Sequence, residues 1–339
     1  MVWLKFLLCF VIILFAGTKL ARYGDVIAEK TGLGGIWIGL VLLAAITSAP
    51  ELVTGVSSAA LVGVPDLAMG TLFGSCLFNL TILALLDILY HPIPILSRVS
   101  LRHIVLAGLG VLLVAIAAGS IFGGGKFSGL ALGWVGISSI IILILYLAGV
   151  WGVFHFERSH QIQPLQASPR QYEESRIRTV WFKFALAAAA VIGAGIWLAF
   201  VGNEIAQTTG WDTSFVGSLF LAIATSMPEL VVTVAALRLG AIDMAVADIL
   251  GANMLDIVVI TWADLFYSRG PILFQPRSLV SDAHLITAAV AVVMSLLVIV
   301  GLRFRQKRKT FIVTSWYAPA LIGLYIFGAY ALFKGIGLG

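Results

Sequence analysis

The chain has 339 residues, of which 60% are apolar and only 11% are charged. This composition excludes an ordinary pair of soluble domains and is typical of a polytopic membrane protein. The formal net charge of +5 does not indicate a nucleic-acid partner, because the basic residues are scattered through short connections rather than gathered beside aromatic side chains.

Long apolar runs follow one another along the whole chain. A membrane-spanning helix needs roughly 20 apolar residues, and about ten runs meet that length. They cover residues 2–21, 33–61, 66–89, 101–122, 128–151, 180–201, 213–239, 243–266, 282–302 and 311–333. We therefore predict an all-α polytopic membrane protein with ten transmembrane helices.

The basic residues also predict an orientation. If the N-terminus is outside, most Lys and Arg residues fall in inside loops, including the run 303–309. The positive-inside rule then places both termini outside. The opening residues 1–17 could be read as a secretory signal, but the segment that follows them matches an internal repeat, which favours a place in the mature fold. Cys9 and Cys76 both fall in predicted spans, so no disulfide or metal-thiolate site is indicated.

The internal repeat is centred on a five-residue motif. Thr47-Ser48-Ala49-Pro50-Glu51 recurs as Thr225-Ser226-Met227-Pro228-Glu229. The residues that follow the motif also align between the two copies: Asp66 with Asp243, Gly74 with Gly251, Asn79 with Asp256 and Asp87 with Asp264. Each repeat holds five predicted spans, and an odd number forces the second repeat to enter the membrane from the opposite side.

The organisation is thus two inverted five-helix repeats. Residues 1–151 form the first, residues 180–339 form the second, and residues 152–179 form a polar cytoplasmic linker. Inverted repeats of this kind are typical of transporters that bind their substrate at the midplane, between broken helices.

The repeated motif predicts breaks in helices 2 and 7. Pro50 and Pro228 lack an amide hydrogen and clash with the preceding turn, so each interrupts its helix and releases nearby carbonyl groups. In one copy, this pattern could equally be a kink whose polar residues satisfy one another. Two copies, each halfway along an apolar run, favour a binding site.

Acidic residues inside spans indicate an ion path, because an ionised carboxylate in the bilayer is costly. We expect Glu51 and Glu229 to meet Asn79 and Asp256, which follow Gly74 and Gly251 by about one turn. Carboxylate, amide and hydroxyl oxygens suit a hard cation, and calcium better than magnesium, since calcium accepts six to eight oxygens in irregular geometry. Zinc or copper would need His or Cys ligands.

Other polar residues lie near the ends of spans. For the four remaining paired aspartates we expect helix-cap or interface roles: Asp66, Asp243, Asp87 and Asp264. A proton-relay role for the histidines has no support in their spacing.

With these residues in view, the chain resembles the sodium/calcium exchanger family of cation/calcium antiporters. The resemblance covers nearly the whole chain and rests on duplicated motifs. They are TSAPELVT at 47–54 with GTLFGSCLFN at 70–79, and TSMPELVV at 225–232 with ADILGANMLD at 247–256.

The resemblance implies exchange of sodium for calcium by alternating access, with helices 1 and 6 sliding across a compact core. It implies that Glu51 and Glu229 coordinate calcium, with Asn79 and Asp256 completing the centre. It also implies that the two glutamates share sodium sites with the side chains of Thr47, Ser48, Ser75, Thr225 and Ser226 and the carbonyls of Ala44 and Ala222.

Two residues depart from the family pattern. Ala252 stands where the family usually has serine, which removes one hydroxyl ligand from the second repeat. Cys76 stands where asparagine is common, and a small residue there occurs in potassium-dependent relatives, so potassium involvement stays open. The proton-coupled branch typically reads Gly-Asn-x-x-Glu at the repeated motif, which argues against protons as the main coupling ion.

We therefore predict a sodium/calcium antiporter that is not an enzyme, works as a monomer in the prokaryotic inner membrane and needs no cofactor. A calcium or other divalent cation/proton antiporter is the alternative within the same class. A channel would more often be a symmetric oligomer, and a catalytic motif such as HExxH is missing from the sequence.

Overall fold

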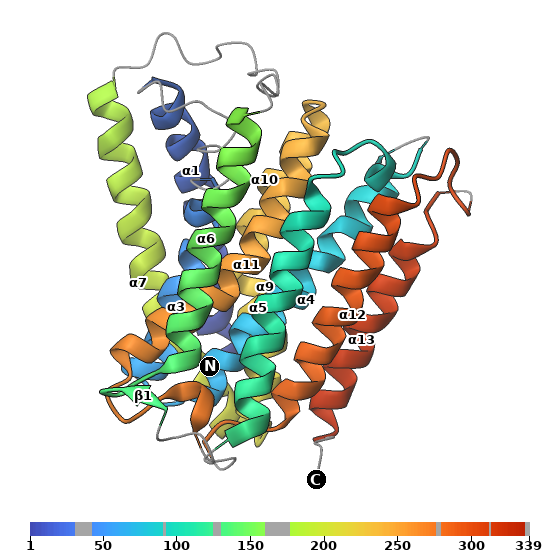
Figure 1. The fold of residues 1–339 in the computed structure, drawn as a ribbon. Coiled ribbons are helices and arrows are strands. Elements are labelled where there is room, and N and C mark those ends of the chain that lie inside the picture. The colour runs from blue at the N-terminus through green and yellow to red at the C-terminus, as the bar shows by residue number, and fades with distance from the viewer. Residues whose placement is uncertain are drawn as a thin grey trace.

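A computed structural model describes most of the chain, and its described residues are nearly all helical (Figure 1). The described ranges are 1–30, 43–90, 93–124, 130–159, 177–275, 279–311 and 313–335. Each of the ten predicted spans contains helix within these ranges. The predicted fold class is thereby confirmed.

The first repeat supplies five of these spans. Its elements are α1 (Val2–Lys30), a helical segment at 43–47, α3 (Ala49–Ala60), α4 (Pro65–Leu89), η1 (Ile95–Ser97), α5 (His103–Gly123), the short hairpin of β1 (Ala131–Leu132) and β2 (Val135–Gly136), and α6 (Ile137–Ser159). The start of the second predicted span, at 33–42, lies outside the described residues.

The second repeat follows the same order. Its elements are α7 (Ile177–Thr209), α8 (Thr213–Val216), the π-helical turn η3 (Gly217–Leu221), α9 (Ala222–Thr225), α10 (Met227–Arg238), α11 (Ile242–Phe266), η4 (Ile272–Phe274), α12 (Ala283–Arg303) and α13 (Tyr317–Phe333). Because α6 continues to Ser159 and α7 begins at Ile177, the two ends of the predicted linker are helical.

The helices differ in how well they meet the length and hydropathy of a membrane span. Six in the described residues do so alone, and the bent segment from α8 to α10 makes a seventh. Two shorter apolar helices, Ile137–Val153 and Tyr317–Phe333, correspond to the fifth and tenth predicted spans. The second predicted span is described only from residue 43 onwards.

Helices α4 and α11 form the centre of the bundle. Of the most apolar stretch of each helix, 72% of α4 and 89% of α11 is buried. Helices α1 and α7 pack against each other at one side, at the left of Figure 1, and bury apolar residues in clusters separate from the main core. The pair contacts the rest of the bundle mainly through the broken helices, α1 against α10 and α7 against α3.

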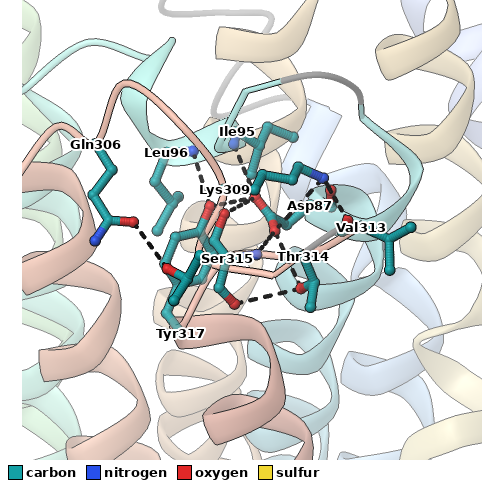
Figure 2. A network of polar contacts seen from close by, with 10 residues as sticks. Asp87, Ile95, Leu96, Gln306, Lys309, Val313, Thr314, Ser315 and Tyr317 are labelled. Carbon is teal, nitrogen blue, oxygen red and sulfur yellow. Dashed lines mark hydrogen bonds and ion pairs between the residues drawn. The ribbon is translucent and has the colours of Figure 1, made fainter.

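Asp87, near the end of α4, ties the first repeat to the last helix of the second (Figure 2). Its carboxylate accepts hydrogen bonds from the amide of Ser315 at 2.8 Å and from the hydroxyl of Tyr317 at 2.5 Å. The ammonium of Lys309 donates to the Asp87 carbonyl. Partial burial lowers the pKa of Lys309, and the nearby Asp87 carboxylate opposes this shift.

Asp264 occupies the matching place at the end of α11 and ties the second repeat to the first. Its carboxylate accepts hydrogen bonds from the Gly136 amide of β2 at 2.8 Å and from the Ser139 hydroxyl in the first turn of α6 at 2.7 Å. Each aspartate also accepts the amide eight residues later, at Ile95 or Ile272.

The other pair of aspartates lies at the starts of the two central helices. Asp66 contacts His284 of α12 at 2.9 Å, and Asp243 contacts His103 of α5 at 2.7 Å. The residues at the N-cap positions are Val64 and Ala241 instead. The interface role is therefore confirmed and the cap role is wrong. All four aspartates bond across the boundary between the repeats.

Candidate ion-binding site

Both copies of the repeated motif break their helices at the serine. Ser48 precedes α3 and Ser226 precedes α10, with φ/ψ of −80°/10° and −87°/7°. Proline stands in the first turn of each following helix, where its missing amide hydrogen costs least. The segments around the second break bend by 42°. The predicted breaks in helices 2 and 7 are both present.

The two broken helices exchange hydrogen bonds between their serines and glutamates. The hydroxyl of Ser226 donates to Oε1 of Glu51 at 2.8 Å. Reciprocally, the hydroxyl of Ser48 donates to Oε1 of Glu229 at 3.3 Å. Each glutamate is therefore held by the repeat to which it does not belong, and both carboxylates are fully buried.

The threonines of the motif turn back onto their own segments. The hydroxyl of Thr47 donates to the Ala44 carbonyl at 3.1 Å, and that of Thr225 donates to the Ala222 carbonyl at 3.3 Å. Each carbonyl also accepts the amide of the serine at the break. Sodium ligation by these carbonyls would therefore have to replace the threonine bond.

The centres of α4 and α11 contribute the remaining predicted ligands. The Asn79 amide donates to Oδ2 of Asp256 at 3.2 Å. The Cys76 thiol lies 3.8 Å from the same oxygen. The Asn79–Asp256 bond thus joins the two repeats at the central helices, as the Ser48–Glu229 and Ser226–Glu51 bonds join them at the broken helices.

Close helix packing brings α4 to the second break. A Cβ atom on Gly74 would lie 2.4 Å from the Cα of Ser218, and one on Gly70 would lie 2.7 Å from the Ser214 carbonyl oxygen. Only glycine permits this approach to α8 and η3. The predicted close approach at Gly74 is confirmed, and it brings this part of α4 against the segment that precedes the second break.

All eleven predicted ligand residues are buried, yet several of their oxygens lack a hydrogen-bond partner. The partnerless atoms are Oε2 of Glu51, Oε2 of Glu229, Oγ of Ser75, Oδ1 of Asn79 and Oδ1 of Asp256. Buried polar atoms are nearly always paired, so five such oxygens in one predicted centre need an explanation. Cation coordination supplies one.

The donor set is mixed rather than purely acidic. Within the described ranges, no three His, Cys, Asp or Glu side chains come together as a metal-binding group. A cation held here would draw on hydroxyl and amide oxygens as well as carboxylates, as calcium and sodium readily do.

Sequence reasoning missed two polar residues of α11. Asp248 and Asn253 are buried, and three of their side-chain oxygens have no partner. Asp248 could have been found, because it is an acid inside an apolar run. The equivalent position of the first repeat is Thr71, which is not an acid. A search for acids that occur in both repeats therefore does not find Asp248.

The chain is similar to known membrane proteins over most of its length. The family model for "Sodium/calcium exchanger protein" matches residues 1–152 and 179–334. The inner membrane protein YrbG of Escherichia coli (strain K12) is 26% identical over 272 residues, covering 77% of this chain and 78% of YrbG. The putative antiporter CaxA of Alkalimonas amylolytica is 25% identical over 271 residues, covering 77% and 79%.

A solved structure has the same fold. The sodium-calcium exchanger NCX_Mj aligns with a TM-score of 0.62 and 21% identity, covering 97% of this chain and 99% of that one. Since the family model spans both repeats and nearly all of the described helices, the chain belongs to the sodium/calcium exchanger family of membrane antiporters.

Proposed function

We propose that this antiporter exchanges sodium for calcium across the prokaryotic inner membrane. Glu51 and Glu229 would bind calcium at the centre with Asn79 and Asp256. Sodium ions would compete for the same carboxylates, assisted by Thr47, Ser48, Ser75, Thr225, Ser226 and the carbonyls of Ala44 and Ala222.

The main support for this exchange is a group of five buried oxygens that have no hydrogen-bond partner. All five belong to residues of the duplicated motifs. Leaving a buried polar atom unpaired costs about 1–3 kcal/mol, so five together indicate a site shaped for a ligand. The mixture of carboxylate, amide and hydroxyl oxygens suits a hard cation.

Competition for the carboxylates would couple the two ions. Moving bare carboxylates past an apolar barrier is costly, whereas a site neutralised by calcium or by sodium can be exposed to either side. The exchanger would therefore change orientation only when loaded.

Helices α1 and α7 are suited to the sliding that alternating access requires. Gly17 of α1 faces Pro228, where a Cβ would lie 2.5 Å from the proline ring, and Gly195 of α7 faces Val53 at 2.9 Å. Helices α1 and α7 thus each place a glycine against the region where one broken helix is interrupted. A single chain contains both sliding helices and both broken helices. We propose that the protein works as a monomer in the lipid bilayer, without a cofactor.

Proton coupling is the second candidate. The free oxygens of Glu51 and Glu229 could hold protons as well as sodium, and the relative CaxA is named only as a putative antiporter. A potassium-dependent form of sodium/calcium exchange is a further variant, suggested by Cys76.

The test is calcium uptake into proteoliposomes under an imposed sodium, potassium or proton gradient. We expect uptake to follow the sodium gradient. Uptake that follows a pH gradient and ignores sodium would establish the proton-coupled alternative instead. Glu51→Gln and Glu229→Gln should each abolish uptake while the protein still elutes as a folded species, and full activity in either variant would remove the site assignment.

A further inference from the structure

The connection between α12 and α13 is strongly basic. Neither aspartate nor glutamate occurs from 303 to 316, and five of the seven residues 303–309 are Arg303, Arg305, Lys307, Arg308 and Lys309. The matching connection of the first repeat, residues 124–136, has Lys126 as its only basic residue. Because that connection does without the charge, the fold of the repeat does not account for the basic run.

Lys309 fastens the basic connection to the end of α4 (Figure 2). Its ammonium donates to the Asp87 carbonyl and, at 2.7 Å, to the Val313 carbonyl, and it lies 3.9 Å from the Asp87 carboxylate. The Phe311 amide donates to the Thr314 carbonyl at 2.9 Å and closes the turn between them. The charge of Lys309 is therefore used inside the protein, and the connection that carries the other four basic residues is fixed to the core.

A second connection places another arginine beside the first. The guanidinium of Arg305 donates to the Val99 carbonyl at 3.0 Å, next to Arg98 in the connection between α4 and α5. The end of α12 packs against the same connection, since a Cβ on Gly301 would lie 2.7 Å from the Leu96 side chain. We call the following exposed residues the basic patch: Arg98, Arg303, Arg305, Lys307 and Arg308.

The charge of the basic patch is not neutralised by the acids around it. Asp87 is engaged by Lys309. Asp243, which accepts the Ser100 amide, pairs with Arg102 and His103. Within the described ranges, no ion pair joins a residue of the basic patch to an acid. The patch therefore presents its positive charges to the surroundings of the protein.

Exposed apolar side chains lie among these charges. Phe304 is 66% exposed, Phe311 is 55% exposed and Val313 is 49% exposed. Cationic side chains interleaved with large apolar ones are typical of a segment that lies among lipid headgroups. The connection begins directly after α12, whose length and hydropathy suit a membrane span. An acidic soluble protein would also match the charge, but the bilayer is the partner that lies beside the end of a span.

The basic patch lies at the end of the bundle that the sequence predicts to be inside. The connection is at the same end as the end of α6 and the start of α7, which border the predicted cytoplasmic linker (Figure 1). The cytoplasmic leaflet carries anionic lipids, and clusters of about four to eight Lys or Arg residues next to a span bind them. Charge, apolar side chains and position therefore agree on one ligand chemistry.

We propose that the basic patch binds the headgroups of anionic phospholipids in the surrounding bilayer. The arginine and lysine side chains donate hydrogen bonds to the phosphate oxygens, and Phe304 and Phe311 contact the acyl chains below the headgroups. Because Lys309 fixes the same connection to α4, a bound lipid strengthens the attachment of the α12–α13 connection to the central helix. The lipid site does not depend on which ions the exchanger carries.

The experiment titrates the purified, full-length protein in a neutral detergent with fluorescently labelled dioleoyl phosphatidylglycerol, and unlabelled lipids then compete for the bound label. Unlabelled phosphatidylglycerol should displace the label at a concentration at least about tenfold lower than phosphatidylcholine with the same chains. Lys307→Gln combined with Arg308→Gln should bind the label about 25-fold more weakly, or about fivefold for each charge removed. Added salt should weaken binding in wild type more than in this variant.

Arg178→Gln combined with Lys183→Gln is the matched control. It removes the same charge from exposed positions of α7 at the same end of the bundle, and it should bind the label like wild type. An equal loss in this control, or equal competition by phosphatidylcholine, would overturn the proposal. Competition by free glycerol phosphate as strong as that by the whole lipid would do so too, because the ligand would then be a soluble anion. If the double variant of the patch does not fold, Lys307→Gln alone replaces it, with about fivefold weaker binding expected.

Discussion

Oδ1 of Asp66 lies 2.9 Å from Nε2 of His284, which joins the start of α4 to the start of α12 across the boundary of the repeats. The same carboxylate accepts the Ser281 amide at 2.7 Å and the Thr213 hydroxyl at 2.6 Å. One acid thereby connects the central helix, the second-repeat core and the beginning of the broken seventh helix.

Asp66→Asn should destabilise the protein by about 3–5 kcal/mol, because it breaks a buried, multiply bonded carboxylate interaction. Asp243→Asn should cost less, since the side chain of Asp243 is 20% exposed against 9% for Asp66. Thermal unfolding in detergent measures the loss of stability in each variant. An equal or larger loss at Asp243 would contradict this ranking.

Gly74→Ala should impair folding through a clash with the backbone of η3. The new Cβ would lie 2.4 Å from Ser218 Cα, which flexible side chains cannot relieve. Gly108→Ala, in α5, is the control, because no atom lies within 4 Å of a Cβ there. We expect it to raise stability by about 0.5–1 kcal/mol through helix propensity. The measurements are the expression level and the melting temperature of each variant relative to wild type. If Gly74→Ala matches wild type in both, the contact between Gly74 and Ser218 is refuted.

Ala252→Ser should strengthen sodium binding by restoring a hydroxyl opposite Ser75. One additional hydrogen-bonding or ligating oxygen contributes about 1 kcal/mol, or about fivefold in affinity. The measurement is the sodium concentration that half-inhibits calcium binding. Ala263→Ser, at another buried position of α11, is the control. No difference between the two variants would mean that residue 252 does not face the ions.

Cys76 should make transport sensitive to cadmium. Its sulfur lies 3.8 Å from the Asp256 carboxylate, and a soft metal ion that displaces the thiol proton can bind sulfur and carboxylate together. Cadmium should therefore inhibit calcium uptake at about tenfold lower concentration in wild type than in Cys76→Ser. Cys9→Ser, in the apolar cluster of α1, should behave like wild type. Equal inhibition of the Cys76 and Cys9 variants would place the cadmium site elsewhere.

The sequence predicted the helices and their inverted order because hydropathy and the repeat report directly on membrane crossing. It also predicted the breaks at Ser48 and Ser226, since proline acts locally. It did not distinguish cap from interface for Asp66 and Asp87, because their partners, such as His284 and Tyr317, are more than 200 residues away. Asp248 escaped notice because its counterpart is not an acid.

The four aspartates that bond across the repeats also constrain how the protein is made. When the ribosome has completed the first five helices, Asp66 and Asp87 are already synthesised, but His284, Ser315 and Tyr317 are not. The first half must therefore remain in the membrane without these partners until the second half is inserted. Two genes, each encoding one half, should yield a working exchanger only when both are expressed in the same cell.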